Sequence, residues 1–229
     1  MVAVIGDIHG CYYTLLELYN RIREKYQKIP IYTVGDLVDR GNHSYEVMSF
    51  VNDEGIKFTP GNHDYMFYHF FKDPSSIFAR SWIFNGNEDT LESYEDHEEA
   101  LFDHIEMVKN APLYYDLEDC YISHAGISNH YQSLLPDNFR SNLNLLSNII
   151  NKDYRTDSGV LWTRDELLNL GKLQVIGHTK QKDIVFDESS FAVYIDTGAC
   201  VGNALSAVIV ERSEIREVIS QKTNLNDII

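Results

Sequence analysis

The first third of the chain alternates between short apolar runs and longer segments with a helical pattern. The runs at residues 2–6, 29–35 and 56–61 are mostly apolar and end in glycine, which is typical of buried strands. Between them, residues 12–26 and 44–55 have the pattern of helices. This strand–helix–strand–helix–strand order predicts right-handed crossovers and a largely parallel beginning of a sheet.

The middle and the end of the chain have different patterns. Residues 66–111 read as helices joined by acidic loops, which predicts a helical cap or insertion. The predicted fold class is α/β (α+β), a single domain over residues 1–229 in which two mixed sheets pack as a sandwich between outer helices. Beyond Pro112 the pattern favours strands, several of them close together as in hairpins, at residues 113–117, 120–126, 173–178, 183–187, 191–198, 204–210 and 215–220.

The charge of the chain excludes some classes of partner. Its 229 residues carry 35 acidic and 19 basic side chains, for a formal net charge of −16. A field of this sign repels polyanions, so we expect neither nucleic acid nor an anionic membrane as a partner. A small phosphate group remains possible as a substrate, because it responds to nearby cations more than to the total charge.

Cysteine usage and the N-terminal residues predict a cellular location. Cys11, Cys120 and Cys200 are widely spaced and odd in number, so they form no disulfide framework and fit a reducing interior. The N-terminus has no basic segment before its apolar residues, unlike a signal peptide. No apolar run approaches the roughly 18 residues needed to span a bilayer. We expect a cytoplasmic protein, and a monomer.

Polar side chains of the same few types follow five of the predicted strands. In an open α/β sheet, ligands bind at the carboxyl ends of the strands, so we expect these side chains to meet at one edge. Five separate segments with this arrangement form a much stronger signal than any one of them. They contribute Asp7 and His9 from "GDIHG", Asp36, Asp39 and Arg40 from "GDLVDRG", Asn62, His63 and Asp64 from "GNHD", and lastly His124 and His178.

These residue types indicate a metal centre that acts on phosphate. Carboxylate, imidazole and amide-carbonyl ligands suit Mn, Fe or Zn. A carboxylate such as Asp36 can bridge two cations, and such pairs, roughly 3.5–4 Å apart, promote in-line hydrolysis of phosphate esters. Arg40 and Arg164 can hold the remaining phosphate oxygens in forked, charge-assisted hydrogen bonds.

The motifs resemble those of the calcineurin-like metallophosphoesterases, and more narrowly those of the phosphoprotein phosphatase branch. "GDIHG", "GDLVDRG" and "GNHD" match the three opening signatures of that branch in order and spacing. Further on, "ISHAG", "LWTR", "IGHT" and "YIDTGA" are similar to the small bacterial and phage phosphatases of lambda type. The resemblance covers residues 4 to about 210 and implies the four-layer fold, a β-sandwich flanked by helices.

The resemblance also implies a role for each residue of the motifs. His63 would be the general acid that protonates the leaving oxygen, and Asp39 would orient it. Arg40, Arg164 and Asn62 would contact the substrate phosphate. The cofactors would be two divalent ions, foremost Mn, with Fe or Zn as alternatives. Asp7, His9 and Asp36 would hold one ion, and the other would be held by Asp36, Asn62, His124 and His178.

The motifs define the type of reaction better than they define the substrate. We expect a phosphomonoesterase, a protein serine/threonine phosphatase that acts on a phosphoprotein or phosphopeptide. The alternative is a symmetrical dinucleoside polyphosphate hydrolase, of which "GNHD" is typical, and Asn87 in "NGNEDTL" also departs from the phosphatase pattern. A third possibility is an inactive scaffold. Such a protein should have lost a metal ligand or the general acid, but every predicted ligand and the acid are present, which disfavours it. A polyphosphate would need more cations, and those near the motifs are Arg40, Arg80, Arg164, Lys180 and Lys182.

Overall fold

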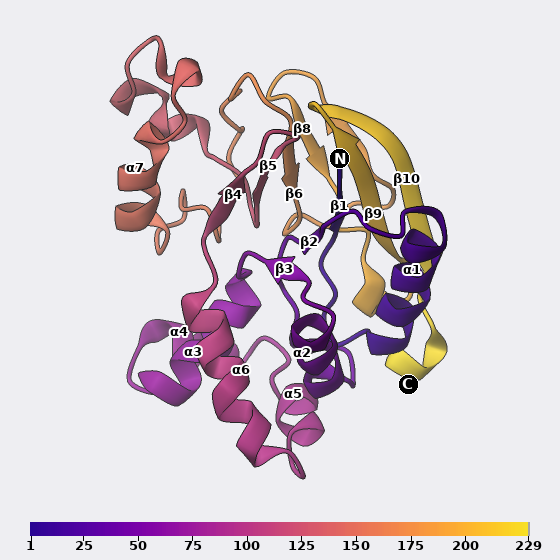
Figure 1. Ribbon diagram of the computed structural model, residues 1–229. Helices are drawn as coiled ribbons and strands as arrows, with labels where there is room; N and C mark the ends of the chain where they lie inside the picture. Colours follow the sequence, from indigo (N-terminus) through magenta and orange to yellow (C-terminus); the bar gives the residue numbers. More distant parts are fainter. Residues whose placement is uncertain (229) are drawn as a thin grey trace.

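The first of two five-stranded sheets contains the strands predicted at the beginning of the chain. A computed structural model describes residues 1–228, and Figure 1 shows both sheets in the upper part of the molecule. The strand order of the first sheet is β10-β9-β1-β2-β3, in which β1, β2 and β3 are parallel and the other two are antiparallel additions. Its strands are β1 (Val2–Ile5), β2 (Ile31–Thr33), β3 (Lys57–Phe58), β9 (Ala204–Glu211) and β10 (Glu214–Lys222).

The second sheet is built from the later strands in the order β4-β5-β6-β8-β7. Its central strands β5, β6 and β8 are parallel, and an antiparallel strand pairs with each edge. Both sheets are therefore mixed, and the predicted sandwich of two mixed sheets is confirmed. The strands are β4 (Tyr114–Asp116), β5 (Tyr121–Ser123), β6 (Gln174–Ile176), β7 (Val185–Asp187) and β8 (Ala192–Tyr194).

Strand β1 shows why its sequence is apolar throughout. Successive side chains of a strand point to opposite faces of the sheet. Val4 packs in the core between the sheets, together with Val175 and Val193 of the second sheet. Ala3 and Ile5 belong instead to the core beneath the helices. Because both faces are covered, the strand has no polar alternation.

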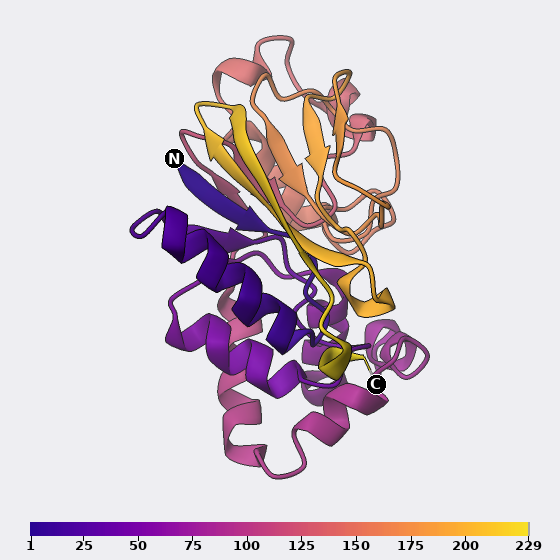
Figure 2. The same ribbon diagram turned by 90° about the vertical axis from the view of Figure 1, so that its right-hand side faces the viewer.

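Helices cover the outer faces of both sheets. Figure 2 shows α1 (Tyr12–Lys25) and α2 (Ser44–Asp53) side by side next to the first sheet. Helix α7 (Leu145–Asp153) and the 3₁₀ turns η1 (Asn129–Leu134) and η2 (Phe139–Ser141) cover the second sheet, where their apolar residues pack with Tyr121. The remaining elements are α3 (Asn62–Lys72), α4 (Ile77–Trp82), α5 (Glu88–Ser93), α6 (Glu98–Asn110), η3 (Ala199–Val201) and η4 (Leu225–Asp227).

Two features differ from the sequence-based expectation. Helix α3 begins at Asn62, so "GNHD" forms its first turn, whereas the helical segment was predicted from residue 66. No element was predicted between residues 127 and 172, where η1, η2 and α7 lie. That residues 66–111 act as a cap stays a prediction. Among the described residues, no helix is both long and apolar enough to cross a membrane.

Candidate metal centre and active site

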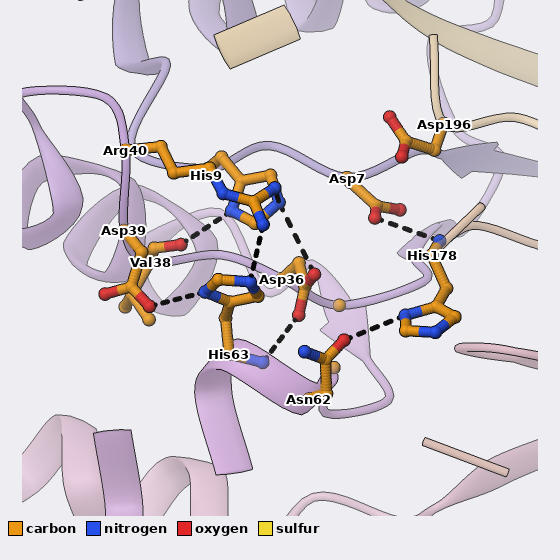
Figure 3. Close-up of polar contacts among 12 residues, drawn as sticks. Asp7, His9, Asp36, Val38, Asp39, Arg40, Asn62, His63, His178 and Asp196 are labelled. Carbon is orange, nitrogen blue, oxygen red and sulfur yellow. Dashed lines mark hydrogen bonds and ion pairs between the residues drawn. The ribbon is translucent and has the colours of Figure 1, made fainter. Parts of the chain in front are cut away.

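The strand-end residues converge at one edge of the two sheets, as Figure 3 shows. Their loops depart sharply from strand geometry, because several residues adopt left-handed backbone conformations that non-glycine residues avoid. Such conformations cost about 1–3 kcal/mol each and persist where the surroundings fix them, commonly at functional sites. The positive φ angles are 48° at His9, 50° at Asp36, 76° at Asp39, 74° at Arg40 and 63° at His178.

Asp36 lies between two imidazoles. Its Oδ2 atom is 3.4 Å from Nε2 of His9 and 3.6 Å from Nε2 of His124. Two overlapping groups of side chains could each hold a metal ion: Asp36 with His9 and His63, and Asp36 with Asp7 and His124. A carboxylate shared by two such groups is positioned as a bridging ligand would be.

Two histidines are held in the tautomer that metal binding requires. Nδ1 of His9 donates to the Val38 carbonyl oxygen at 2.9 Å, and Nδ1 of His124 donates to the Val34 carbonyl oxygen at 2.8 Å. Their Nε2 lone pairs therefore face Asp36, an arrangement typical of histidines that bind a metal. Burial is the main reason why the pKa of His9 is lowered to about 3, which keeps this imidazole neutral at pH 7.

Asn62 places an oxygen acceptor against the ring nitrogens of two histidines. Its Oδ1 atom is 3.1 Å from Nε2 of His124 and 2.9 Å from Nδ1 of His178. The other ring nitrogen of His178 faces the Trp162 carbonyl oxygen at 3.2 Å. Burial, and then the neighbouring His124, lower the pKa of His178 to about 3, so the ring is neutral at pH 7. Its single N–H can donate to only one of the two oxygens that face the ring. A divalent cation would relieve this excess of acceptors.

Asp7 supplies a carboxylate oxygen that has no hydrogen-bond partner in the described part of the chain. Oδ2 accepts a hydrogen bond from the His178 backbone N–H at 3.0 Å, but the buried Oδ1 accepts none from the described residues. Burial, and then Asp196 and Asp36, raise the pKa of Asp7, because its negative charge is not compensated. Gly177 is required beside it, since a Cβ atom there would lie 1.8 Å from Oδ1 of Asp7. The donor set thus fits divalent cations bound through oxygen and nitrogen.

His63 and Asp39 form a buried pair next to this cluster. Nδ1 of His63 donates to Oδ2 of Asp39 at 2.6 Å. Burial alone would lower the pKa of His63, but the charges of Asp36 and Asp39 and the hydrogen bond outweigh it, and the net shift is upward. Asp39 also accepts hydrogen bonds from Trp82 Nε1 and Thr90 Oγ1, each at 2.8 Å. Trp82 and Thr90 were not predicted: Thr90 lies in "NGNEDTL", but nothing in the local sequence indicates that either residue contacts Asp39.

Arg40 connects the two halves of the site. Its guanidinium donates to Nε2 of His9 and to Nε2 of His63, both at 2.8 Å (Figure 3). It lines a cavity of about 490 Å³ together with Arg164, Lys180 and His178. The two arginines predicted from the motifs therefore face the same space, whereas Arg80 is not among its lining residues.

Two further aspartates organise the site. Oδ1 of Asp64 accepts from the Leu37 N–H and Oδ2 from the Gly61 N–H, each at 2.8 Å, so this carboxyl ties two ligand-bearing loops together. Burial, and then the Asp36 charge, raise the pKa of Asp64 to about 7. Asp196 was not predicted, although "DTG" follows a strand as the other motifs do. It is 6% exposed, lines the same cavity and accepts from the Gly198 N–H at 3.0 Å.

Comparisons with known proteins find relatives that align over most of this chain. The bis(5'-nucleosyl)-tetraphosphatase PrpE [asymmetrical] of Anoxybacillus flavithermus is 29% identical over 224 residues, covering 90% of this chain and 88% of that protein. A provisionally named diadenosine tetraphosphatase structure matches with a TM-score of 0.61 and 19% identity, covering 96% of this chain and 92% of that one. A protein serine/threonine phosphatase structure from Saccharomyces cerevisiae matches with a TM-score of 0.62 and 17% identity, covering 96% and 79%.

At these identities the solved structures establish the fold alone. The family is established independently, since the model of the calcineurin-like phosphoesterases matches residues 1–195. Members of this family use divalent metals, in agreement with the candidate ligand groups around Asp36. The chain therefore belongs to the calcineurin-like phosphoesterases and is a hydrolase of the metallophosphoesterase type.

Proposed function

We propose that this chain hydrolyses dinucleoside tetraphosphates asymmetrically, to a nucleoside triphosphate and a nucleoside monophosphate. The observation that carries the proposal is the convergence of Arg40, Arg164 and Lys180 on one cavity of about 490 Å³ beside the candidate ligands. Arg and Lys side chains bind phosphate oxygens through charge-assisted hydrogen bonds, and a polyphosphate offers several such groups to one cavity. The names of relatives that align over most of both chains support the same substrate class.

For the binding of a polyphosphate, the charge of the side chains around the cavity matters more than the net charge of −16. Lys180 is placed by the fold, because its stem packs against Gly198, where an added Cβ would lie 3.1 Å from Cδ of Lys180. Field lines concentrate in a cleft, so three cations in one cavity attract a polyanion even on an acidic protein. The sequence-based expectation of a phosphopeptide substrate rested on the phosphatase-like motifs, and the small number of cations near them counted against a dinucleotide.

The proposal assigns a role in this reaction to the residues of the site. Asp7, His9, Asp36, Asn62, His124 and His178 would hold two divalent cations, foremost Mn. When bound, these cations would offset phosphate charge and lower the pKa of the attacking water. Arg40 and Arg164 hold the non-attacked phosphate oxygens in forked hydrogen bonds. With Nδ1 bonded to Asp39, His63 would donate a proton from Nε2 to the leaving oxygen, once Nε2, which accepts from Arg40 in this structure, is itself protonated.

A protein serine/threonine phosphatase is the second candidate, and the His63–Asp39 pair favours it. The alkoxide released from phosphoserine is far more basic than a nucleotide phosphate, so it gains most from a positioned acid. A dinucleoside tetraphosphate releases a good leaving group and depends less on this pair. The two candidates therefore differ in how strongly each would need His63.

The deciding experiment compares kcat/KM for diadenosine tetraphosphate with kcat/KM for a set of phosphopeptides at saturating Mn. We expect the dinucleotide to be preferred at least tenfold, about 1.4 kcal/mol, with AMP and ATP as products rather than two ADP. Lys180→Gln should lower this preference, whereas Lys182→Gln, whose side chain does not line the cavity, should leave it unchanged. A tenfold preference for any phosphopeptide would support the second candidate instead.

A further inference from the structure

A second cavity lies beside α3, and none of the candidate metal ligands lines it. It has a volume of about 400 Å³ and is bordered by α3, by α7 and by the connection from α6 to β4, which Figure 1 shows on the left of the molecule. Its walls include Tyr65, Tyr68 and Tyr154, and polar groups come from Lys109, Asn151 and Arg155. None of its lining residues lines the cavity that contains Arg40 and Arg164.

Tyr65 brings an unsatisfied hydroxyl group to this cavity. The residue is 7% exposed, and its buried hydroxyl lies beside the Tyr154 hydroxyl and the Arg155 guanidinium without a hydrogen bond of normal geometry to any described residue. An unmade hydrogen bond of this kind costs about 1–3 kcal/mol. A phenylalanine would fill the same space without that cost, so stability of the protein alone does not account for the hydroxyl.

Arg155 brings a cation to the cavity without an ion pair to a described carboxylate. Its Cζ atom lies 5.1 Å from the ring centre of Tyr154 and 5.9 Å from that of Tyr65, and Nε donates to the Tyr154 hydroxyl at 3.0 Å. Among the described residues, no acidic side chain lies within ion-pair distance of it. Lys109 differs, because Glu106 pairs with its ammonium at 2.7 Å.

These groups define the chemistry of a ligand. Tyrosine rings offer flat faces to an aromatic ring, and a guanidinium binds a carboxylate or phosphate through paired hydrogen bonds. A volume of about 400 Å³ is within the range of small-molecule sites. We propose that this cavity is a second ligand site, which binds a small aromatic anion: the ring lies among the tyrosines, and the anionic group meets Arg155 and the Tyr65 hydroxyl.

Calorimetric titration of the Mn-loaded protein tests this site. Phenylphosphonate and benzoate are the probes, since neither can be hydrolysed, and inorganic phosphate tests the anion without the ring. We expect saturable binding of phenylphosphonate or benzoate that Arg155→Gln weakens at least tenfold. Arg140→Gln is the matched control, because Arg140 also stacks on an aromatic ring, that of Phe139, but outside this cavity.

Tyr65→Phe separates a ligand-binding role from a structural one. We expect it to weaken probe binding while the melting temperature of the unliganded protein rises, because a buried unsatisfied hydroxyl is removed. Arg164→Gln is titrated in parallel, since a phosphonate also fits the metal centre. The proposal is wrong if no probe binds, if Arg164→Gln removes all binding while Arg155→Gln removes none, or if Tyr65→Phe leaves binding unchanged.

Discussion

The carboxylate of Asp39 accepts a hydrogen bond from Nδ1 of His63 at 2.6 Å, and neither residue is more than 2% exposed. This contact fixes the imidazole in one orientation, with Nε2 pointed toward Arg40. Trp82 and Thr90 hold the carboxylate in turn. The pair therefore has the geometry of a positioned acid whose own support extends into the helical segment of the chain.

His63→Asn should lower kcat on phenyl phosphate, whose leaving group needs a proton, by roughly 10²–10⁴, the range expected when a general acid is lost. The decrease should be smaller for 4-nitrophenyl phosphate than for phenyl phosphate, because nitrophenolate departs without protonation. Steady-state kinetics on the two substrates would measure this, with metal content checked by elemental analysis. Equal losses on both substrates would remove His63 from the role of the acid.

Chelation should abolish activity, and Mn should restore it more fully than Mg. The candidate ligands include several imidazoles, and Mg prefers shells made of oxygen alone. Asp36→Asn should lower the bound metal more than Asp7→Asn, because Asp36 belongs to both ligand groups. Reactivation assays at matched saturating concentrations would measure the first effect and elemental analysis the second. Equal recovery with Mg and Mn would contradict the expected ligand preference.

Arg164→Gln should raise KM and lower kcat without a change in metal content. A guanidinium that holds phosphate oxygens contributes to substrate binding and more strongly to the transition state, where charge shifts. Arg80→Gln is the control, since Arg80 is not among the residues that line the 490 Å³ cavity. If Arg164→Gln kept wild-type kinetics and Arg80→Gln did not, the phosphate contact would have to be reassigned to Arg80.

His69 should make the protein less stable in mild acid. It is 7% exposed among aromatic residues such as Tyr65 and Phe78, and neither ring nitrogen has a hydrogen-bond partner among the described residues. Burial lowers its pKa, Arg155 adds to that effect, and Asp73 opposes it. In the unfolded chain the imidazole titrates near its usual value of about 6.5.

Below that pH the unfolded state therefore binds a proton that the folded state does not, and stability falls as the pH is lowered. The melting temperature should fall more between pH 7.5 and pH 5.5 for the wild type than for His69→Phe. His130→Phe, which replaces an exposed imidazole, should behave like the wild type. Identical pH dependence in His69→Phe and the wild type would show that this imidazole does not contribute.

Asp227→Ala should destabilise the fold although it lies near the C-terminus. The buried carboxylate accepts hydrogen bonds from the backbone N–H groups of Tyr13 and Thr14 and from Thr14 Oγ1, which caps the beginning of α1. Loss of a helix N-cap costs about 0.5–2 kcal/mol. Urea denaturation would measure the change, with Asp157→Ala at an exposed position as the control. An unchanged unfolding midpoint would show that water replaces this cap without loss.

The sequence by itself determined the layered fold and most of the candidate metal ligands. Short apolar runs followed by Asp, Asn or His carry this information locally, and parallel strands bring their carboxyl ends to one edge whatever the loops do. Asp36 and His124 are 88 positions apart, yet each could be assigned from the strand directly before it. For the same reason Asp196, which follows β8, could have been found.

The tertiary structure decided the contacts between segments that share no local pattern. Lys180 reaches the cavity of the two arginines because its stem packs on Gly198, and Trp82 reaches Asp39 because α4 packs on α3. The cavity at Tyr65 and Arg155 likewise exists only where α3 and α7 meet. A residue's neighbours across such contacts depend on how helices pack, and helix packing depends on the volumes and shapes of many side chains together.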